Sequence, residues 1–146
     1  MPERNQEPML IIKNFDQFLD ALNLCETGIY TYDEIIESVP LDAEEVTAYA
    51  AKSSETSNLQ NIMARKHFSV SLVNLAPEES ISINENLSNS WIKCIQGELS
   101  LGNSKTIENQ TDTQLLVDQT MKFTHQQAIT NKGEYQSKGL LITHQE

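Results

Sequence analysis

The spacing of apolar residues changes from helical to alternating near residue 57, and this change limits the folds open to the chain. Before it, Phe15, Phe18 and Leu22 follow one another at spacings of three and four, which places them on one face of a helix. After it, residues such as Phe68 and Val70 alternate with small polar residues, as in strands with one buried face. Helices followed by regularly spaced strands predict an α+β, mainly β protein.

Three capping patterns predict where the helices begin. In each, an Asn, Thr or Asp is followed three residues later by Gln or Glu, a spacing that allows reciprocal capping of the first turn. The pairs are Asn14 with Gln17, Thr31 with Glu34, and Asp42 with Glu45. The second helix is expected to run to about Ser38, because Pro40 cannot continue it.

Turn residues divide the remainder of the chain into strands. Gly97 separates a predicted strand pair over 91–101, and 114–118 and 139–144 are the last strong strand candidates. Further turns are predicted at Gly102-Asn103, Asn109-Gln110 and Lys132-Gly133. We expect a disordered tail at 1–9 and one domain at 10–146, composed of a helical cap at 10–56 and a β-barrel at 57–146.

The charge of the chain makes several classes of partner unfavourable. Its 10 basic and 21 acidic residues leave a net charge of −11, which repels nucleic acid and anionic membrane surfaces. The sequence contains no apolar run of about 18 residues and no N-terminal pattern typical of a secretory signal. A cytoplasmic location is therefore expected, with Cys25 and Cys94 as reduced thiols.

A set of motifs between residues 58 and 144 has a characteristic spacing. The motifs are Asn58-Leu-Gln-Asn61, Phe68-Ser-Val-Ser-Leu-Val73, Pro77-Glu78, Asn84-Glu-Asn86, Ser90-Trp-Ile-Lys-Cys-Ile-Gln-Gly-Glu98, Gln127-Ala-Ile-Thr-Asn131 and Leu140-Leu-Ile-Thr-His144. This framework resembles the cysteine dioxygenase family of thiol dioxygenases, a branch of the cupins, over about residues 10–144. The resemblance implies short N-terminal helices packed on a small cupin barrel, the double-stranded β-helix or RmlC-like jelly roll.

The functional positions of that family are replaced in this chain. By the resemblance, the three iron ligands fall at Asn84, Asn86 and Gln127, and amides are poor ligands because they offer no basic nitrogen lone pair. The family's substrate-binding arginine falls at Gln60, and its thioether-forming residue falls at Ser90. Its supporting histidine falls at Ile142, and its tyrosine falls at His144. The resemblance therefore predicts a pseudoenzyme: metal-free, without a cofactor or catalytic residues.

The replaced site leaves two interpretations open for its amides. Asn84, Asn86 and Gln127 would line a pocket that binds a small polar molecule, or they would satisfy one another in a collapsed site. The first interpretation requires Asn84 to point inward, together with Ser80 and Ser82, which share its alternation. We predict a non-catalytic cupin that binds a small polar ligand or a protein partner.

An enzyme is the alternative hypothesis. His125 and His144, with Glu85 or Asp118, would rebuild a two-histidine, one-carboxylate site for iron or another divalent metal. This needs His144 to point inward and His125 to replace Gln127, whereas Asn131 favours Gln127 in the family's register. A metal-independent cupin isomerase belongs to the same class of hypothesis.

Two further expectations concern the faces and edges of the sheets. Ser90 and Cys94 are expected to face the barrel interior, and Trp91 is expected to face outward and pack under the helices. The sequence stops near the last motif strand, which is expected to leave an open sheet edge. A homodimer formed through such edges is the corresponding prediction.

Overall fold

The structure is a computed structural model that describes residues 12–28, 30–39, 41–51, 58–83, 89–102, 113–123 and 127–144. Its helices are α1 (Phe15–Leu24), α2 (Tyr32–Ser38) and α3 (Ala43–Ala50), with a short 3-10 helix at Cys25–Thr27. Its strands are β1 (Leu59–Ala64), β2 (Phe68–Leu75), β3 (Ser80–Ile83), β4 (Asn89–Gln96), β5 (Glu98–Gly102), β6 (Thr113–Leu116), β7 (Thr120–Phe123), β8 (Gln127–Thr130) and β9 (Ser137–His144). The predicted tail at 1–9 lies outside the described residues.

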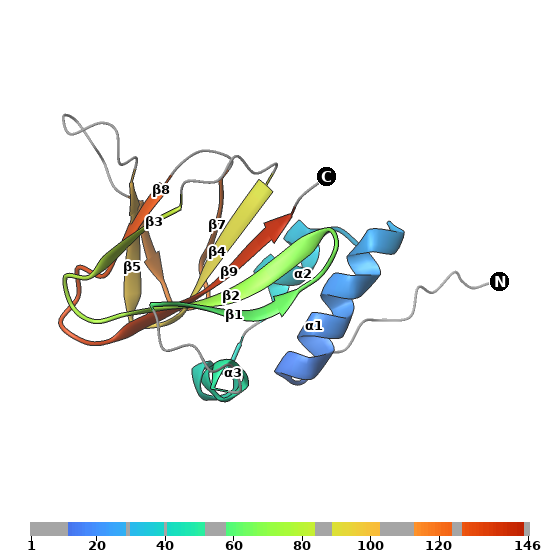
Figure 1. The fold of residues 1–146 in the computed structure, drawn as a ribbon, viewed down its shortest axis with the longest axis horizontal. Helices are drawn as coiled ribbons and strands as arrows, with labels where there is room; N and C mark the ends of the chain where they lie inside the picture. The colour runs from blue at the N-terminus through green and yellow to red at the C-terminus, as the bar shows by residue number, and fades with distance from the viewer. Residues whose placement is uncertain are drawn as a thin grey trace.

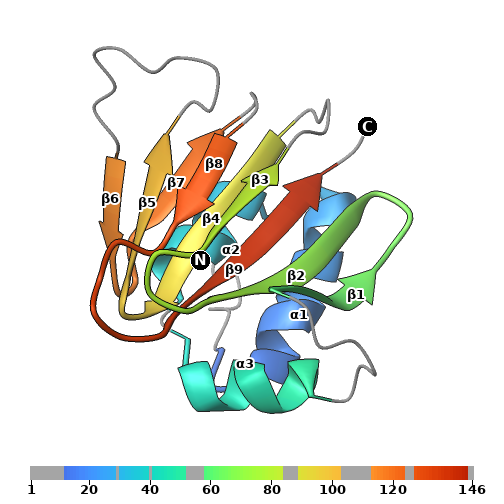
Figure 2. The same cartoon turned by 60° about the vertical axis from the view of Figure 1, so that its left-hand side comes forward.

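The strands form two antiparallel sheets. The five-stranded sheet has the order β1-β2-β9-β4-β7, and the four-stranded sheet has the order β3-β8-β5-β6. The helices lie against the outer face of the five-stranded sheet, and the four-stranded sheet lies on its other side (Figures 1 and 2). The predicted mainly β architecture with a helical cap is confirmed.

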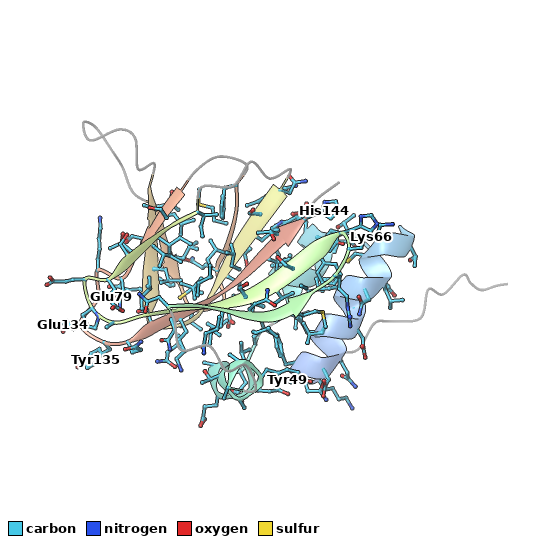
Figure 3. All side chains as sticks on the ribbon, viewed as in Figure 1. Tyr49, Lys66, Glu79, Glu134, Tyr135 and His144 are labelled. Atoms are coloured by element: carbon cyan, nitrogen blue, oxygen red, sulfur yellow. The ribbon has the colours of Figure 1, made fainter. Side chains whose placement is uncertain are left out.

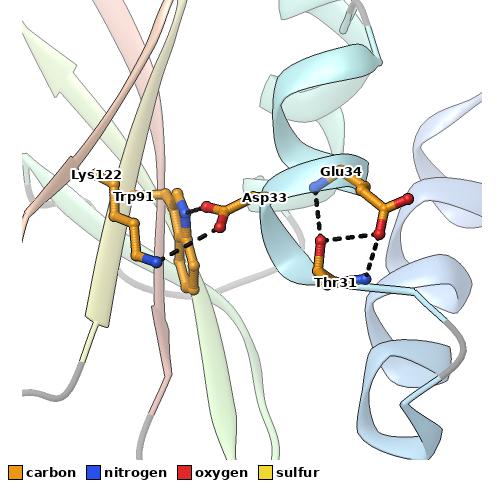
Figure 4. Close-up of polar contacts among 5 residues, drawn as sticks. All are labelled: Thr31, Asp33, Glu34, Trp91 and Lys122. Carbon is orange, nitrogen blue, oxygen red and sulfur yellow. Dashed lines mark hydrogen bonds and ion pairs between the residues drawn. The ribbon is translucent and has the colours of Figure 1, made fainter.

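The helix starts follow the capping residues. Thr31 and Glu34 form a complete capping box: Glu34 N donates to Thr31 Oγ1 over 3.1 Å, and Thr31 N donates to Glu34 Oε1 over 3.2 Å (Figure 4). Asn14 accepts from the backbone of Gln17 as predicted. Asp42 caps α3 by accepting from Glu44 N instead of joining Glu45 in a box. Local side-chain chemistry therefore sets all three boundaries.

The buried apolar side chains fall into two clusters, one on each face of the five-stranded sheet. The helix-side core lies between the helices and this sheet and includes Phe15, Phe18, Leu22, Ile36, Val46, Phe68, Val70, Leu72, Trp91, Ile95, Leu140 and Ile142. The barrel core lies between the two sheets and consists of Val73, Leu75, Ile83, Ile92, Cys94, Leu99, Leu101, Leu115, Phe123, Ile129 and Leu141. The central strands of this sheet are therefore covered on both faces.

Two local expectations about strands and edges need correction. The strand predicted at 114–118 ends at Leu116, because the chain turns there and Asp118 adopts a positive φ of 75°. The expected open edge at the C-terminal strand is wrong, because β9 lies between β2 and β4. Of the predicted turns, Asn103 and 109–110 lie outside the described residues.

No helix within the described ranges has the length and apolar character that crossing a bilayer requires.

Candidate functional site

The barrel interior is packed with apolar side chains around the inward positions of β4. Cys94 and Ile92 belong to the barrel core, and Cys94 is fully buried. Ser90 is buried and pairs in register with Thr143 on one side and Phe123 on the other. The predicted inward direction of Cys94 is confirmed. The described core around Ile92 and Cys94 is therefore apolar, and the buried hydroxyls of Ser90 and Thr143 lie beside it.

The outward prediction for Trp91 is also confirmed. Trp91 lies in the helix-side core with 2% of its surface exposed. Its indole Nε1 donates to Asp33 Oδ1 over 2.6 Å, which ties β4 to the first turn of α2 (Figure 4). Lys122 lies 3.5 Å from Asp33 Oδ2 and 5.4 Å from the centre of the Trp91 ring. Trp91 therefore docks the helical cap onto the sheet.

Most of the predicted amide pocket lies outside the described residues. Asn84, Asn86 and His125 are not among them, and for Gln127 only the backbone is described, where it pairs with Ile83. The pocket and the use of His125 as a ligand stay predictions.

The facing of β3 differs from the expected alternation. Ile83 belongs to the barrel core and Ile81 packs against it, whereas Ser80 and Ser82 are exposed. The expectation that the side chains of Ser80 and Ser82 point into the barrel is therefore wrong. Burying two isoleucines is favoured over burying two serine hydroxyls, because a buried hydroxyl needs a hydrogen-bond partner.

The other family positions do not meet in the barrel. Ile142 belongs to the helix-side core, and Gln60 pairs with Leu72, whose side chain lies in that core. The ring of His144 lies 4.8 Å from the ring of Tyr32 in α2. The predicted inward direction of His144 is wrong, because the register of β9 turns Ile142 and His144 toward the helices.

Two framework residues of the resemblance, Gly97 and Asn131, have structural roles in this fold. Gly97 has a φ of 71°, and a Cβ there would clash with Ser137 Oγ, so only glycine suits the turn between β4 and β5. Asn131 is fully buried and donates through Nδ2 to Leu75 O over 2.9 Å and to Tyr135 O over 2.7 Å. These residues therefore stabilise turns, and neither role needs a metal.

A polar concavity lies outside the barrel, between α2 and the turn that joins β6 to β7. We name it the Thr120 cavity; its volume is about 500 Å³, and its lining residues are Glu37, Thr113, Gln114, Leu115, Asp118, Gln119 and Thr120. The hydroxyl of Thr120 is enclosed and has no hydrogen-bond partner within the described ranges. An enclosed hydroxyl without a partner is uncommon in folded proteins, so this cavity is a candidate binding site.

A buried lysine lies next to this cavity. Lys93 pairs in register with Thr120, is 1% exposed, and donates from Nζ to Ile36 O over 2.7 Å. Burial lowers the pKa of Lys93, and the carboxylates of Asp118 and Glu37 act in the opposite direction. Two carboxylates facing one ammonium leave an excess of negative charge at the cavity. This site could not be predicted from the sequence, because its residues lie far apart in the chain.

The two thiols are buried and weakly acidic. Burial raises the pKa of Cys94 to about 11, and the nearby carboxylates of Asp118 and Glu98 add to the rise. Burial also raises the pKa of Cys25 to about 11, with a further contribution from Glu34. Because the thiolate is the reactive form, both side chains are poor nucleophiles and poor metal ligands at neutral pH.

The residues at the family's iron positions do not suit that metal. Asn84, Asn86 and Gln127 supply amides, whereas iron of this kind needs basic nitrogen or carboxylate donors. The described residues also contain no group of three His, Cys, Asp or Glu side chains arranged to hold an ion.

Comparison with known proteins identifies the fold. The cupin domain of an XRE family transcriptional regulator from Enterobacter cloacae matches with a TM-score of 0.51 and 17% identity, covering 60% of this chain and 95% of that one. A Klebsiella pneumoniae protein with a double-stranded β-helix domain matches with a TM-score of 0.55 and 14% identity, covering 68% and 85%. The Schizosaccharomyces pombe Cnp3 cupin domain matches with a TM-score of 0.52 and 11% identity, covering 65% and 66%.

These matches confirm the predicted cupin fold, and identities this low concern the fold alone. No family model matches the chain. No curated protein matches it either.

Proposed function

We propose that this chain is a catalytically inactive cupin-fold protein that binds a small, positively charged polar ligand in the Thr120 cavity. The main supporting observation is a cavity of about 500 Å³ that is lined by the carboxylates of Glu37 and Asp118 and by Thr120, whose buried hydroxyl has no hydrogen-bond partner among the described residues. A ligand with an ammonium group and a hydroxyl would satisfy both features, because charge-assisted hydrogen bonds to carboxylates are the strong ones.

The likeness to cysteine dioxygenase is part of this proposal. The retained motif residues Gly97 and Asn131 form turns, and Trp91 packs the helical cap. The family's metal positions carry amides at Asn84 and Asn86. A chain that keeps the framework and replaces the donors is expected to lose iron chemistry while retaining the fold.

The charge of the cavity favours a single positive charge on the ligand. Glu37 and Asp118 contribute two carboxylates, and buried Lys93 offsets one of them. The polar side chains of Gln114, Gln119 and Thr120 then supply hydrogen-bond donors and acceptors around the ligand. The cavity is larger than ethanolamine needs, so a larger amino alcohol or an amino sugar also suits it.

Titration of the isotope-labelled protein with ethanolamine, followed by NMR, tests this function. We expect saturable shift changes centred on the backbone amides of residues 113–120. Replacing Asp118 with Asn keeps a residue type that tolerates its positive φ of 75° and is expected to weaken binding at least about fivefold, because one carboxylate is lost. Glu37→Gln is expected to act in the same direction.

Glu44→Gln is the matched control, because Glu44 is exposed on α3 and does not line the cavity. It changes the net charge equally and should alter the affinity by less than about twofold. Equal weakening by Glu44→Gln and Asp118→Asn would indicate diffuse charge attraction, and it would contradict binding in this cavity.

A further inference from the structure

A second concavity differs from the Thr120 cavity in character. It has a volume of about 190 Å³, is mainly apolar, and is lined by Gly97, Glu98, Leu116, Gly133, Glu134, Tyr135 and Ser137. We name it the Tyr135 groove. Its lining comes from the turn between β4 and β5, the end of β6 and the loop between β8 and β9. These turns gather at one end of the barrel (Figure 2).

Apolar side chains are unusually exposed around this groove. Of its lining residues, Tyr135 is 79% exposed and Leu116 is 50% exposed, and Val117, next to Leu116 in the chain, is 48% exposed. They are three of the five large hydrophobic residues that are exposed in the described part of the chain. Single exposed apolar residues are ordinary, but a group beside a groove indicates an interaction surface.

Hydrogen bonds from the Asn131 side chain hold the backbone of the loop that carries Tyr135. Buried Asn131 donates to Tyr135 O over 2.7 Å and accepts from Gly133 N over 2.9 Å. On the opposite side, Ser137 Oγ accepts from Glu98 N over 3.1 Å. The backbone that carries the exposed Tyr135 ring is therefore held in place, so a partner that binds there does not have to order the loop.

The rim of the groove is acidic. Glu98 and Glu134 line it. The backbone of Asn131 also pairs with that of Glu78 and Glu79 over 2.7 and 3.0 Å. Glu79, Glu134 and Tyr135 lie at the same end of the molecule, away from Lys66 and His144 (Figure 3). Lys132 is a cation in the same loop, so the two lining carboxylates of Glu98 and Glu134 outnumber its one ammonium.

We propose that the Tyr135 groove binds a basic segment of a protein partner in which apolar and Arg or Lys side chains alternate. An aliphatic side chain would enter the groove beside Leu116. The neighbouring cation would lie over the Tyr135 ring, where the π face attracts it, and would pair with Glu134. A second copy of this chain is a poor occupant, because two acidic rims would face each other on molecules of charge −11. This surface is separate from the Thr120 cavity, and its test is independent.

Fluorescence anisotropy with a labelled peptide of repeating glycine, leucine and arginine tests the proposal. Two control peptides replace leucine with serine or arginine with glutamine. We expect the first peptide to bind more tightly than either control, with an affinity that falls as salt is added. Tyr135→Ala should weaken it about tenfold, and Glu134→Gln about threefold. Because both side chains are exposed, these variants should fold as the parent does.

Glu44→Gln on α3 again removes one exposed charge away from the groove, and it should change the affinity by less than about twofold. Three results would each overturn the proposal. One is the absence of binding up to about 1 mM peptide. Another is equal binding of the leucine and serine peptides. The third is equal weakening by Glu134→Gln and Glu44→Gln, which would mean unspecific attraction to an acidic surface.

Discussion

At the scale of single residues, Lys93 is the least expected feature of the protein. A fully buried lysine costs free energy unless its ammonium is hydrogen-bonded or paired. Here Nζ donates to Ile36 O in the last turn of α2. That carbonyl is one of the helix-end acceptors without an intrahelical partner, and a cation is favoured at that end of the helix dipole. Lys93 therefore connects α2 to β4, although burial removes its ammonium from water at a cost in free energy.

This desolvation of Lys93 predicts that the stability of the protein depends on pH. Burial lowers the pKa of Lys93 in the folded protein from its ordinary value of 10.5. Between the two pKa values the unfolded chain binds more protons, so the free energy of unfolding rises as the pH rises toward 10.5. Lys93→Met lacks this contribution. As the pH rises, the difference in the free energy of unfolding between the parent and the variant should therefore grow in favour of the parent. The growth should reach about 1.4 kcal/mol for each unit by which burial lowers the pKa.

Urea unfolding of both proteins at several pH values, from neutral to 10.5, measures this difference. Other groups titrate equally in the two proteins and cancel. A difference that stays constant with pH would contradict the assignment of a lowered pKa to Lys93.

At the scale of elements, the docking of α2 depends on the contact between Asp33 and Trp91. The indole nitrogen of Trp91 is buried, and Asp33 Oδ1 accepts from it over 2.6 Å. Asp33→Ala should lower the free energy of unfolding by about 1–3 kcal/mol, because a buried donor would lose its acceptor. The ion pair with Lys122 is close to half exposed and adds little. Chemical unfolding followed by the fluorescence of the single tryptophan measures the loss.

Asp16→Ala provides the matched control. Asp16 also lies in the first turn of a helix and is exposed. Its removal costs the same favourable interaction with the helix dipole, about 0.5 kcal/mol, without affecting Trp91. Equal losses for the two variants would mean that the indole contact contributes nothing to docking.

The sequence predicted elements well where the determining contacts are local. The capping box of Thr31 and Glu34 is confirmed because it depends on residues three positions apart. The facing of strands was harder to predict, because β4 and β9 are buried on both faces. In such strands alternation no longer distinguishes interior from exterior, and for this reason His144 was wrongly assigned to the barrel interior. Strands β1, β7 and β8 were missed because their apolar residues do not alternate strongly.

At the scale of the whole molecule, the two concavities both involve β6. The Thr120 cavity includes Gln114 and the Tyr135 groove includes Leu116. Neither site could be predicted from the sequence, because each is assembled from segments far apart in the chain, such as Glu37 of α2 and Asp118 of the β6–β7 turn. Only the fold brings these charges together.

The barrel interior is the other feature of the whole molecule that bears on the proposed function. Its described residues form an apolar core around Ile92, Cys94 and Leu141. The family's metal positions at Asn84 and Asn86 supply amides in place of basic donors. We therefore propose that the cupin fold is kept for binding and holds no catalytic iron.

The metal content of the purified, untagged protein, measured by inductively coupled plasma mass spectrometry without added metal, tests this claim most directly. We predict iron, nickel and zinc each below about 0.1 atom per chain, because amide donors bind these ions weakly. Iron or another of these metals near one atom per chain would contradict the account and support a rebuilt site involving His125 or His144.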